Sequence, residues 1–246
     1  MEIIQPTDQP INIADWNRDE EFAQYPAGIS IFEAYFPGGD YCQQYIPSFD
    51  RKKGKQHNFE TVSQIFEDLN KKYPTFNADW KKYWAKAFLF DALIGNTDRH
   101  QDNWGIIATL AQQNNTLPIL EKMRISPVFD NGTSMGNEIF PGKFKCYDDN
   151  NHLVKYISKG WHHMKWSIDG PQMGHIEMLQ KFIDRYPEAR QTMLDCLKKL
   201  TSETFKTILD ELIAFDAPVR LTPERATFML KLLQFRHQHL LTELEK

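Results

Sequence analysis

GNTDRHQDNWGII, residues 95–107, places a dense group of polar side chains between two segments that both look buried. An apolar, helix-like segment precedes the group, and the strand-like residues 104–107 follow it. The polar side chains that fall within six residues are Asp98, Arg99, His100, Asp102 and Asn103. Polar surface loops are common, but a loop between two buried segments rarely needs two carboxylates, a histidine and an amide. The stretch therefore predicts a loop that carries chemistry.

The composition of the 246-residue chain predicts a globular protein with a sizeable core, as one large domain or two small ones, because 41% of its residues are hydrophobic. The net charge is only -4, so we expect no direct binding to nucleic acid and no membrane association. No apolar run approaches the roughly 20 residues that span a bilayer, and no signal peptide opens the chain. Three widely spaced cysteines argue against a disulfide framework and favour a reducing compartment.

The first part of the chain carries strand and turn signals. Alternating β-forming residues predict a strand over 29–36, and the residues after it, 37–40 (PGGD), are a turn signal. Residues 1–28 are rich in Pro, Asn and Asp, and we expect them to be mostly irregular. The basic segment 51–55 (RKKGK) is interpreted as a solvated surface loop, with substrate docking as the sharper alternative.

Helical spacing of apolar residues dominates the remainder of the chain. The predicted helices are 60–73, 78–94, 173–185, 187–200, 202–215 and 222–245. For the second of these, Asn77 is the predicted N-cap and Gly95 the predicted C-terminal stop. A hairpin is predicted from 103–110 and 116–120, with a turn at 112–115, and a further apolar segment over 125–129 ends in Asp130.

The candidate catalytic and metal-binding residues are Asp98, Asn103 and Asp130, because each lies where a segment that looks buried ends or begins. A carboxylate and an amide oxygen are hard ligands that suit Mg²⁺ held jointly with substrate phosphates. The other carboxylate, five residues before the amide, could orient a hydroxyl and accept its proton. Taken singly, each residue is explained by a helix cap or a turn. Taken together, they favour phosphoryl transfer, which needs positioning, metal and an oriented acceptor.

Two motifs carry a resemblance to a known family. Residues 96–100 (NTDRH) followed by 103–105 (NWG) resemble the catalytic loop of HipA-like serine/threonine kinases, the bacterial toxin-type kinases, and 126–132 (SPVFDNG) resembles their metal-binding segment. The resemblance implies an ATP- and Mg²⁺-dependent enzyme. Asp98 is then the catalytic base, and Arg99 and His100 support the loop or the phosphates. Asn103 and Asp130 are the Mg²⁺ ligands. Phosphoinositide 3-kinases share a similar D-R-H-x-x-N loop, so the motif first marks a broad kinase-like group.

Further segments agree with this resemblance. Residues 31–41 sit where the interlobe hinge of these kinases would lie, which implies that backbone groups of Ala34, Tyr35 and Phe36 meet adenine. Residues 156–166 and the last helix are also similar to shorter HipA-like proteins. The pair His162-His163 lacks a third ligand at metal-site spacing, so we interpret it as a surface or core-edge pair rather than a zinc site.

Two departures from the family pattern matter. Asp102 stands where many HipA-like loops carry a lysine, and its charge could repel phosphate or bind a second Mg²⁺. A kinase small lobe also needs a lysine that neutralises phosphates, yet residues 1–28 contain no lysine and one glycine, Gly28. Three hypotheses follow. The chain is a split or truncated kinase completed by a partner, a minimal kinase that uses other cations such as Arg99 or the 51–55 loop, or a non-catalytic binding descendant.

We therefore predict an α+β fold, namely a protein-kinase-like, mostly helical large lobe with a small β-hairpin insert and a reduced or missing N-terminal small lobe. Residues 1–36 would be the remnant of the small lobe and the hinge strand, and 37–246 the helical large lobe. The expected function is HipA-like phosphorylation of a protein hydroxyl. The alternatives are a pseudokinase, interaction module or regulatory subunit of a toxin-antitoxin-type system, and thirdly a lipid-kinase-like enzyme. The expected partners are a protein substrate and a small-lobe-supplying or antitoxin-like protein, in a bacterial cytoplasm or as a delivered effector.

Overall fold

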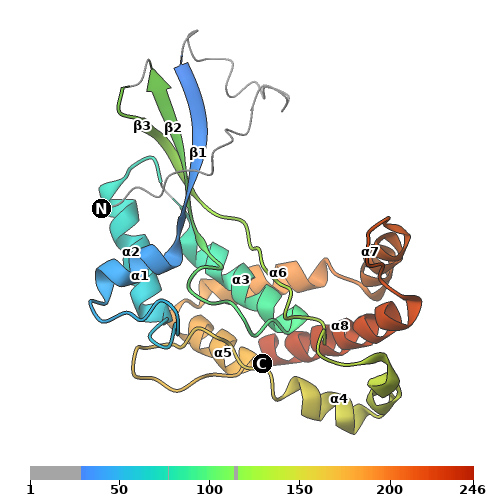
Figure 1. Ribbon diagram of the computed structural model, residues 1–246. Helices are drawn as coiled ribbons and strands as arrows, with labels where there is room; N and C mark the ends of the chain where they lie inside the picture. Colours follow the sequence, from blue (N-terminus) through green and yellow to red (C-terminus); the bar gives the residue numbers. More distant parts are fainter. Residues whose placement is uncertain (1–28, 77, 114–115) are drawn as a thin grey trace.

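The computed structural model describes residues 29–76, 78–113 and 116–246. The irregular segment predicted for 1–28 and the predicted cap Asn77 lie outside these residues. In the described part, a small sheet projects from a mostly helical part (Figure 1). Its strands are β1 (Ile29–Pro37), β2 (Gly105–Gln113) and β3 (Ile119–Ile125). Both strand pairs are antiparallel, in the order β1-β2-β3.

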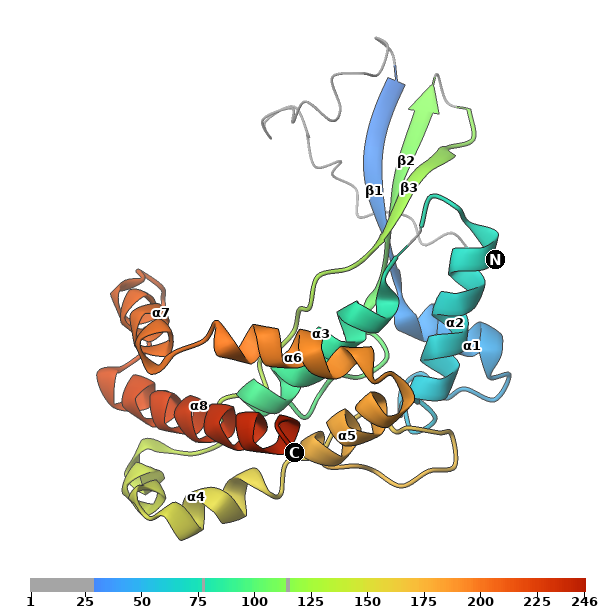
Figure 2. The same cartoon turned by 180° about the vertical axis from the view of Figure 1, so that it is seen from behind.

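The helices form the part of the molecule from which this sheet projects. They are α1 (Gly38–Tyr45), α2 (Phe59–Lys72), α3 (Trp80–Ile94), the 3₁₀ helix η2 (Pro141–Asp148), α4 (Asn150–Ile157), α5 (His175–Arg185), α6 (Glu188–Lys198), α7 (Ser202–Ala214) and α8 (Pro223–Leu244). Helix α3 is central and packs against α5, α6 and α8, as the view from behind also shows (Figure 2). None of the described helices is long and apolar enough to cross a membrane.

Helix α3 forms as its sequence indicates, with one correction at its start. It begins at Trp80 instead of 78, because the side chain of Asp79 accepts a hydrogen bond from the amide of Lys82 and so caps the first turn. It ends at Gly95, as predicted, in the left-handed conformation with φ of 69°. A Cβ at Gly95 would lie 2.1 Å from Nη2 of Arg236, so packing as well as φ demands glycine there.

An aromatic cluster holds α2, α3 and α5 together. Phe59, at the start of α2, is fully buried at its centre. The rings whose centroids lie 5.1 to 6.4 Å from that of Phe59 belong to Trp80, Trp84, Phe88, Trp166, Phe182 and Tyr186. Most are tilted or edge-on, which is the favourable arrangement for ring quadrupoles. The aromatics at helical spacing are therefore core residues, and α3 is a rigid support for the loop that follows it.

The turn predicted at residues 37–40 is instead the start of α1. The two glycines serve close packing here, because a Cβ at Gly38 would lie 2.1 Å from the Trp104 ring and one at Gly39 would lie 2.4 Å from an Asp102 carboxylate oxygen. The amide of Gly38 also donates to the carbonyl of Trp104 at 2.8 Å. Strand β1 is thus followed directly by helix α1, which packs against the polar loop that precedes β2.

The hairpin is present, but its second strand is placed differently from the prediction. Strand β3 covers 119–125 rather than 116–120, so the apolar segment 125–129 is split between the strand end and an irregular stretch. The helices α1 and α4 and the 3₁₀ helix η2 were not predicted. Leu153 of α4 packs with Phe228 and Leu232 of α8 in a second small core, which the local sequence pattern does not reveal.

The sheet joins both of the predicted domains. Strand β1, assigned to the 1–36 remnant, pairs with β2 over its whole length, from Ile29 opposite Gln113 to Pro37 opposite Gly105. The hairpin β2-β3 therefore extends β1 into a three-stranded sheet. A functional division at residue 36 remains a prediction.

Candidate active site

The loop after α3 is organised by the side chain of Asn96, which is fully buried. Its Oδ1 accepts hydrogen bonds from the backbone amide of Asp98 at 3.1 Å and from the hydroxyl of Thr133 at 3.0 Å. Its Nδ2 donates to a carboxylate oxygen of Asp91 at 2.9 Å. One amide therefore connects the end of α3, the candidate catalytic loop and the segment after Asp130.

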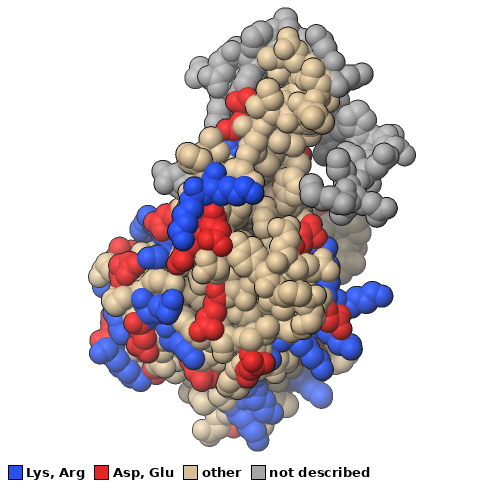
Figure 3. All heavy atoms as spheres, turned by 90° about the vertical axis from the view of Figure 1, so that its left-hand side faces the viewer, with Lys and Arg blue, Asp and Glu red and all other residues tan. Residues whose placement is uncertain are grey.

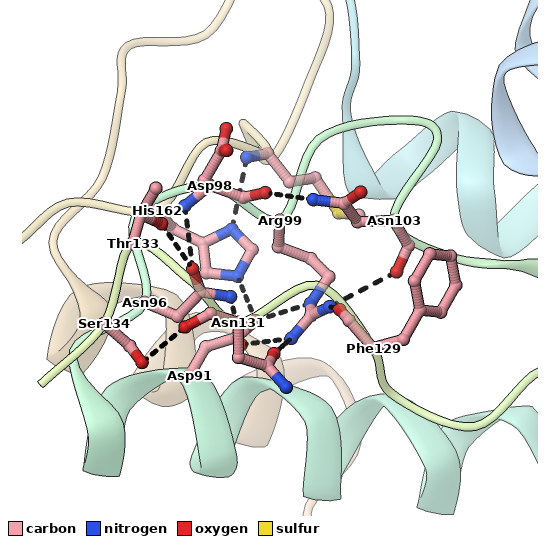
Figure 4. A network of polar contacts seen from close by, with 11 residues as sticks. Asp91, Asn96, Asp98, Arg99, Asn103, Phe129, Asn131, Thr133, Ser134 and His162 are labelled. Carbon is pink, nitrogen blue, oxygen red and sulfur yellow. Dashed lines mark hydrogen bonds and ion pairs between the residues drawn. The ribbon is translucent and has the colours of Figure 1, made fainter. Parts of the chain in front are cut away.

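Arg99 forms the centre of the site and is only 1% exposed. Its Nη2 and Nε donate to the two carboxylate oxygens of Asp91 at 2.6 and 3.1 Å, a bidentate ion pair. Nη1 donates to the main-chain carbonyls of Phe129, at 2.7 Å, and Asn103, at 3.2 Å. Nη2 also donates to the side-chain oxygen of Asn131 at 2.8 Å (Figure 4). A single guanidinium thus ties the two predicted metal-binding segments to α3.

Asp91 is the residue of this site that sequence reasoning missed. It lies on the buried face of α3 among apolar side chains and is itself 0% exposed. Burial alone would raise the pKa of its carboxyl, but hydrogen bonds from His162 and Arg99 outweigh that effect and hold the pKa below its ordinary value. The signal in the sequence was a carboxylate on an apolar helix face, which implies a buried cationic partner.

His162 completes the partners of Asp91 and corrects the prediction of a surface or core-edge residue, because its exposure is 0%. Its Nδ1 accepts the amide of Met164 at 3.2 Å, so the ring proton resides on Nε2, which lies 3.2 Å from the Asp91 carboxylate. With its proton on Nε2, the ring donates to the carboxylate. His162 is therefore a structural donor.

Asp98 and Asn103 are coupled through the loop backbone. The Nδ2 group of Asn103 donates to the main-chain carbonyl of Asp98 at 2.6 Å. This bond fixes the amide, and the Oδ1 atom of Asn103 accepts no hydrogen bond from the part of the chain that the structure describes. The carboxylate of Asp98 points away from the network (Figure 4). Both residues thus present unused oxygen atoms, as a metal ligand and a base require.

Asp130 lies between the two residues, Phe129 and Asn131, that bind Arg99. Its side chain is exposed, and its backbone is in the left-handed region with φ of 53°. Asp tolerates this conformation better than most residues, although it is uncommon outside glycine. Arg99 binds the main-chain carbonyls of Phe129, next to Asp130, and of Asn103, so it connects the two segments that carry these side chains.

The donor set fits Mg²⁺ better than a softer metal. Carboxylate and amide oxygens are its usual protein ligands, and it commonly keeps waters and substrate phosphates as the others. Among the described residues, no group of three or more His, Cys, Asp or Glu side chains could enclose a metal ion. The chemistry of the two candidate oxygen ligands, a carboxylate and an amide, suits an Mg²⁺ ion shared with substrate phosphates.

The Asp102 side chain is paired with the basic loop 51–55. Its carboxylate accepts from Nη2 of Arg51 at 2.9 Å, and Arg51 also pairs with Asp40. Its backbone amide donates to Nδ1 of His100 at 3.1 Å, so the His100 ring accepts within its own loop. The departure from the family pattern is explained by an ion pair to the basic loop.

Tyr35 places the predicted hinge strand against the loop. Its hydroxyl donates to the main-chain carbonyl of Trp104 at 2.9 Å, and its ring lies edge-on to Phe129 with centroids 5.8 Å apart. Burial, followed by the charge of Asp102, raises the pKa of this phenol above its ordinary value. The predicted hinge strand, the candidate catalytic loop and the predicted metal-binding segment therefore meet at this tyrosine.

The register of β1 shows which of the three residues predicted to contact adenine has backbone groups that do not pair with β2. Gly38 bonds to Trp104, so alternation along the antiparallel pair directs the backbone groups of Ala34 and Phe36 toward β2. Those of Tyr35 point away from β2, and β1 is the edge strand of the described sheet. Of the three residues, Tyr35 alone keeps its main-chain donor and acceptor for a ligand on that edge.

The fold is a kinase-like α+β fold, mostly helical with a three-stranded antiparallel sheet. The solved structure that carries this assignment is the proinflammatory kinase CtkA of Helicobacter pylori. The match has a TM-score of 0.60 at 16% sequence identity and covers 86% of this chain and 67% of CtkA. At this identity the similarity concerns the fold. No protein-family model matches the sequence, and no curated protein matches it at a significant level.

Proposed function

We propose that this chain is a HipA-like serine/threonine protein kinase that transfers the γ-phosphoryl group of ATP to a protein hydroxyl. Asp98 is the catalytic base in this proposal, and Asn103 and Asp130 are the ligands of Mg²⁺. The kinase-like fold supports phosphoryl transfer in general. The catalytic-loop and metal-segment motifs support the serine/threonine class.

One observation carries the proposal. Nη1 of Arg99 binds the carbonyls of both Asn103 and Phe129, so a buried guanidinium holds the two metal-ligand segments together. The same loop turns the carboxylate of Asp98 outward (Figure 4). A purely structural ion pair would need no outward carboxylate on the same loop as an Asn103 oxygen that accepts no hydrogen bond from the described residues.

The reaction assigns a task to each residue. Asp98 orients the acceptor hydroxyl and takes its proton, while the hydroxyl oxygen forms a bond to the γ-phosphorus and the bond to the β,γ-bridging oxygen breaks, releasing ADP. Bound Mg²⁺ would neutralise the phosphate oxygens. Asn103 and Asp130 supply the side-chain oxygens that hold it.

Arg99 supports the loop in this proposal and does not contact the phosphates, because its nitrogen atoms already donate to Asp91, Asn131 and two carbonyls. His100 likewise supports the loop through the amide of Asp102. The main chain of Tyr35 is the proposed adenine contact. A phosphoacceptor protein is the partner that this function requires, and a protein that supplies a small lobe or acts as an antitoxin is compatible with it.

The test is the thermal shift of the chain with ATP, measured with and without Mg²⁺. A ligand at about 100 times its dissociation constant stabilises by roughly 2.7 kcal/mol, which is roughly 5 to 10 °C for a chain of this size. We expect that rise to depend on Mg²⁺ and to be lost in Asp130→Asn, which removes the charge but tolerates the left-handed backbone. Asp130→Ala should behave alike, whereas Asp184→Asn, an exposed change on α5, should retain the rise.

Two results would contradict the proposal. An equal rise with and without Mg²⁺ would remove Asp130 from the site. Absence of any rise in the unaltered chain would show that it does not bind the nucleotide by itself and would favour the interaction module.

A further inference from the structure

A cavity of about 630 Å³ opens beside the proposed base. The residues that line it are Arg51, Lys52, Lys53, Asp98, His100, Gln101, Asp102 and His163. Asp98 is among them, whereas Asn103, Asp130 and the hinge strand are not among the described residues that form its wall. The cavity therefore reaches Asp98 without being lined by the proposed metal ligands.

The basic loop 51–55 is firmly attached at this cavity. The guanidinium of Arg51 pairs with Asp102, and its carbonyl accepts from Nε2 of Gln101 at 2.6 Å. Gly54, at φ of 59°, packs so closely that a Cβ there would lie 2.3 Å from Oε1 of Gln101. The loop is thus bound to the catalytic loop by both side-chain and main-chain contacts, which fixes its lysines beside Asp98.

Three cations, Arg51, Lys52 and Lys53, line the cavity together with the carboxylates of Asp98 and Asp102. Arg51 is shared between Asp40 and Asp102, so its charge is fully balanced within the chain. Lys52 has no ion-pair partner among the residues that the structure describes. Lys53 lies 3.4 Å from Asp50, but its side chain is 69% exposed, where such a pair is weak. Burial lowers the pKa of His163, so its ring adds no charge at neutral pH.

We propose that Lys52 and Lys53 select phosphoacceptors that carry an aspartate or glutamate within about three residues of the target hydroxyl. The cavity, taken as a sphere, is roughly 11 Å across, and an extended peptide covers about 3.3 Å per residue. The selected residue pairs with the lysines while the hydroxyl reaches Asp98. This assignment rests on the proposed kinase function and adds its substrate class.

The surroundings favour an acidic peptide over a nucleic acid. On the face that carries α1 and α2, Lys and Arg side chains are intermixed with Asp and Glu (Figure 3). A nucleic-acid site generally has a continuous basic stripe or patch, because it must neutralise many phosphates. Two lysines beside one cavity match a short acidic segment better.

The experiment measures peptide binding directly, so it does not depend on catalysis. Fluorescent peptides with one central serine carry glutamates, glutamines or lysines within three positions of it, and fluorescence anisotropy gives their affinities for the full chain. We expect the glutamate peptide to bind about tenfold more tightly than the lysine peptide. The double variant Lys52→Glu/Lys53→Glu should abolish or reverse this preference. The control Lys198→Glu/Lys199→Glu makes the same charge change at two adjacent exposed lysines near the end of α6 and should keep it.

Equal affinities for the three peptides, or a preference that survives in the Lys52→Glu/Lys53→Glu variant, would overturn the proposal. So would a preference of these lysines for a single-stranded oligonucleotide over the glutamate peptide. The thermal shift with Mg²⁺ and ATP is measured on the same samples. A lost shift with an intact peptide preference would refute the kinase function, and an intact shift without the preference would refute the substrate class alone.

Discussion

Replacing Asp91 by asparagine is the sharpest test of the network that supports the site. The carboxylate is 0% exposed and faces the guanidinium of Arg99, which is 1% exposed, at 2.6 Å. It also receives hydrogen bonds from Asn96 and His162. The variant keeps the side-chain volume but leaves a buried guanidinium without its counter-charge.

The size of the effect follows from that burial. Breaking one side of a buried ion pair costs about 3 to 5 kcal/mol, because the remaining charge stays desolvated and unpaired. For a chain of this length, each kcal/mol lowers the melting temperature by roughly 2 to 4 °C, so we expect Asp91→Asn to melt roughly 10 °C lower. Arg99→Met should have a comparable cost, since it leaves the carboxylate unpaired.

Urea unfolding of both single variants and the double variant gives the coupling free energy between Asp91 and Arg99. We expect the double variant to be less destabilised than the sum of the two by about 2 kcal/mol. Glu33→Gln is the control, because the Arg124–Glu33 pair is 42% and 46% exposed and should contribute at most about 1 kcal/mol. An Asp91→Asn variant within 1 kcal/mol of the unaltered protein, or strictly additive effects, would refute this view of the network.

Three further outcomes can be measured. Asp98→Asn should keep the Mg²⁺-dependent thermal shift with ATP. Its rate of phosphoryl transfer to any acceptor that the unaltered protein modifies should fall at least about 100-fold. An equal rate of transfer would disprove the base assignment. Burial lowers the pKa of His175 to about 3, so the folded state binds fewer protons than the unfolded state between pH 6.5 and 3. The stability that neutral His175 contributes is therefore present above pH 6.5 and is lost on acidification, by up to about 1.4 kcal/mol per pH unit. In urea unfolding measured at several pH values, His175→Phe should flatten this dependence of the unfolding free energy on pH. Gly95→Ala should lower the unfolding free energy by at least about 2 kcal/mol, because it strains a φ of 69° and displaces Arg236, and an unchanged urea midpoint would contradict this.

Local pattern predicted much of the helical part of the fold. Helices α5 to α8 begin and end within a few residues of the predicted ranges, because apolar spacing and caps act over three or four residues. The same local rules misplaced α1, whose glycines look like a turn until Trp104 and Asp102 lie against them. They also missed α4, whose small core is formed with the distant helix α8.

The residues of the candidate site also fall into those that the sequence indicates and those that only the structure shows. Asp98, Asn103 and Asp130 stand out in the sequence because polar residues interrupt buried segments, and their roles remain a proposal. The roles of Asp91 and His162 cannot be found in the sequence, because Asp91 lies on an apolar helix face and His162 looks like half of a surface or core-edge pair. Their significance depends on contacts such as the one between Asp91 and His162, which lie 71 residues apart.

By itself, then, the sequence determined most of the long helices, the position of the polar loop between α3 and β2, and the oxygen ligands available for the proposed phosphoryl-transfer site. The tertiary structure decided how the loop is held, through Arg99 to Asp91 and Phe129, and which lysines stand beside Asp98, through the pairing of Arg51 with Asp102. The physical reason is the separation along the chain over which each kind of interaction acts. Periodicity and capping are encoded within one or two helical turns, whereas a buried charge is stable only where the folded chain brings its partner from elsewhere.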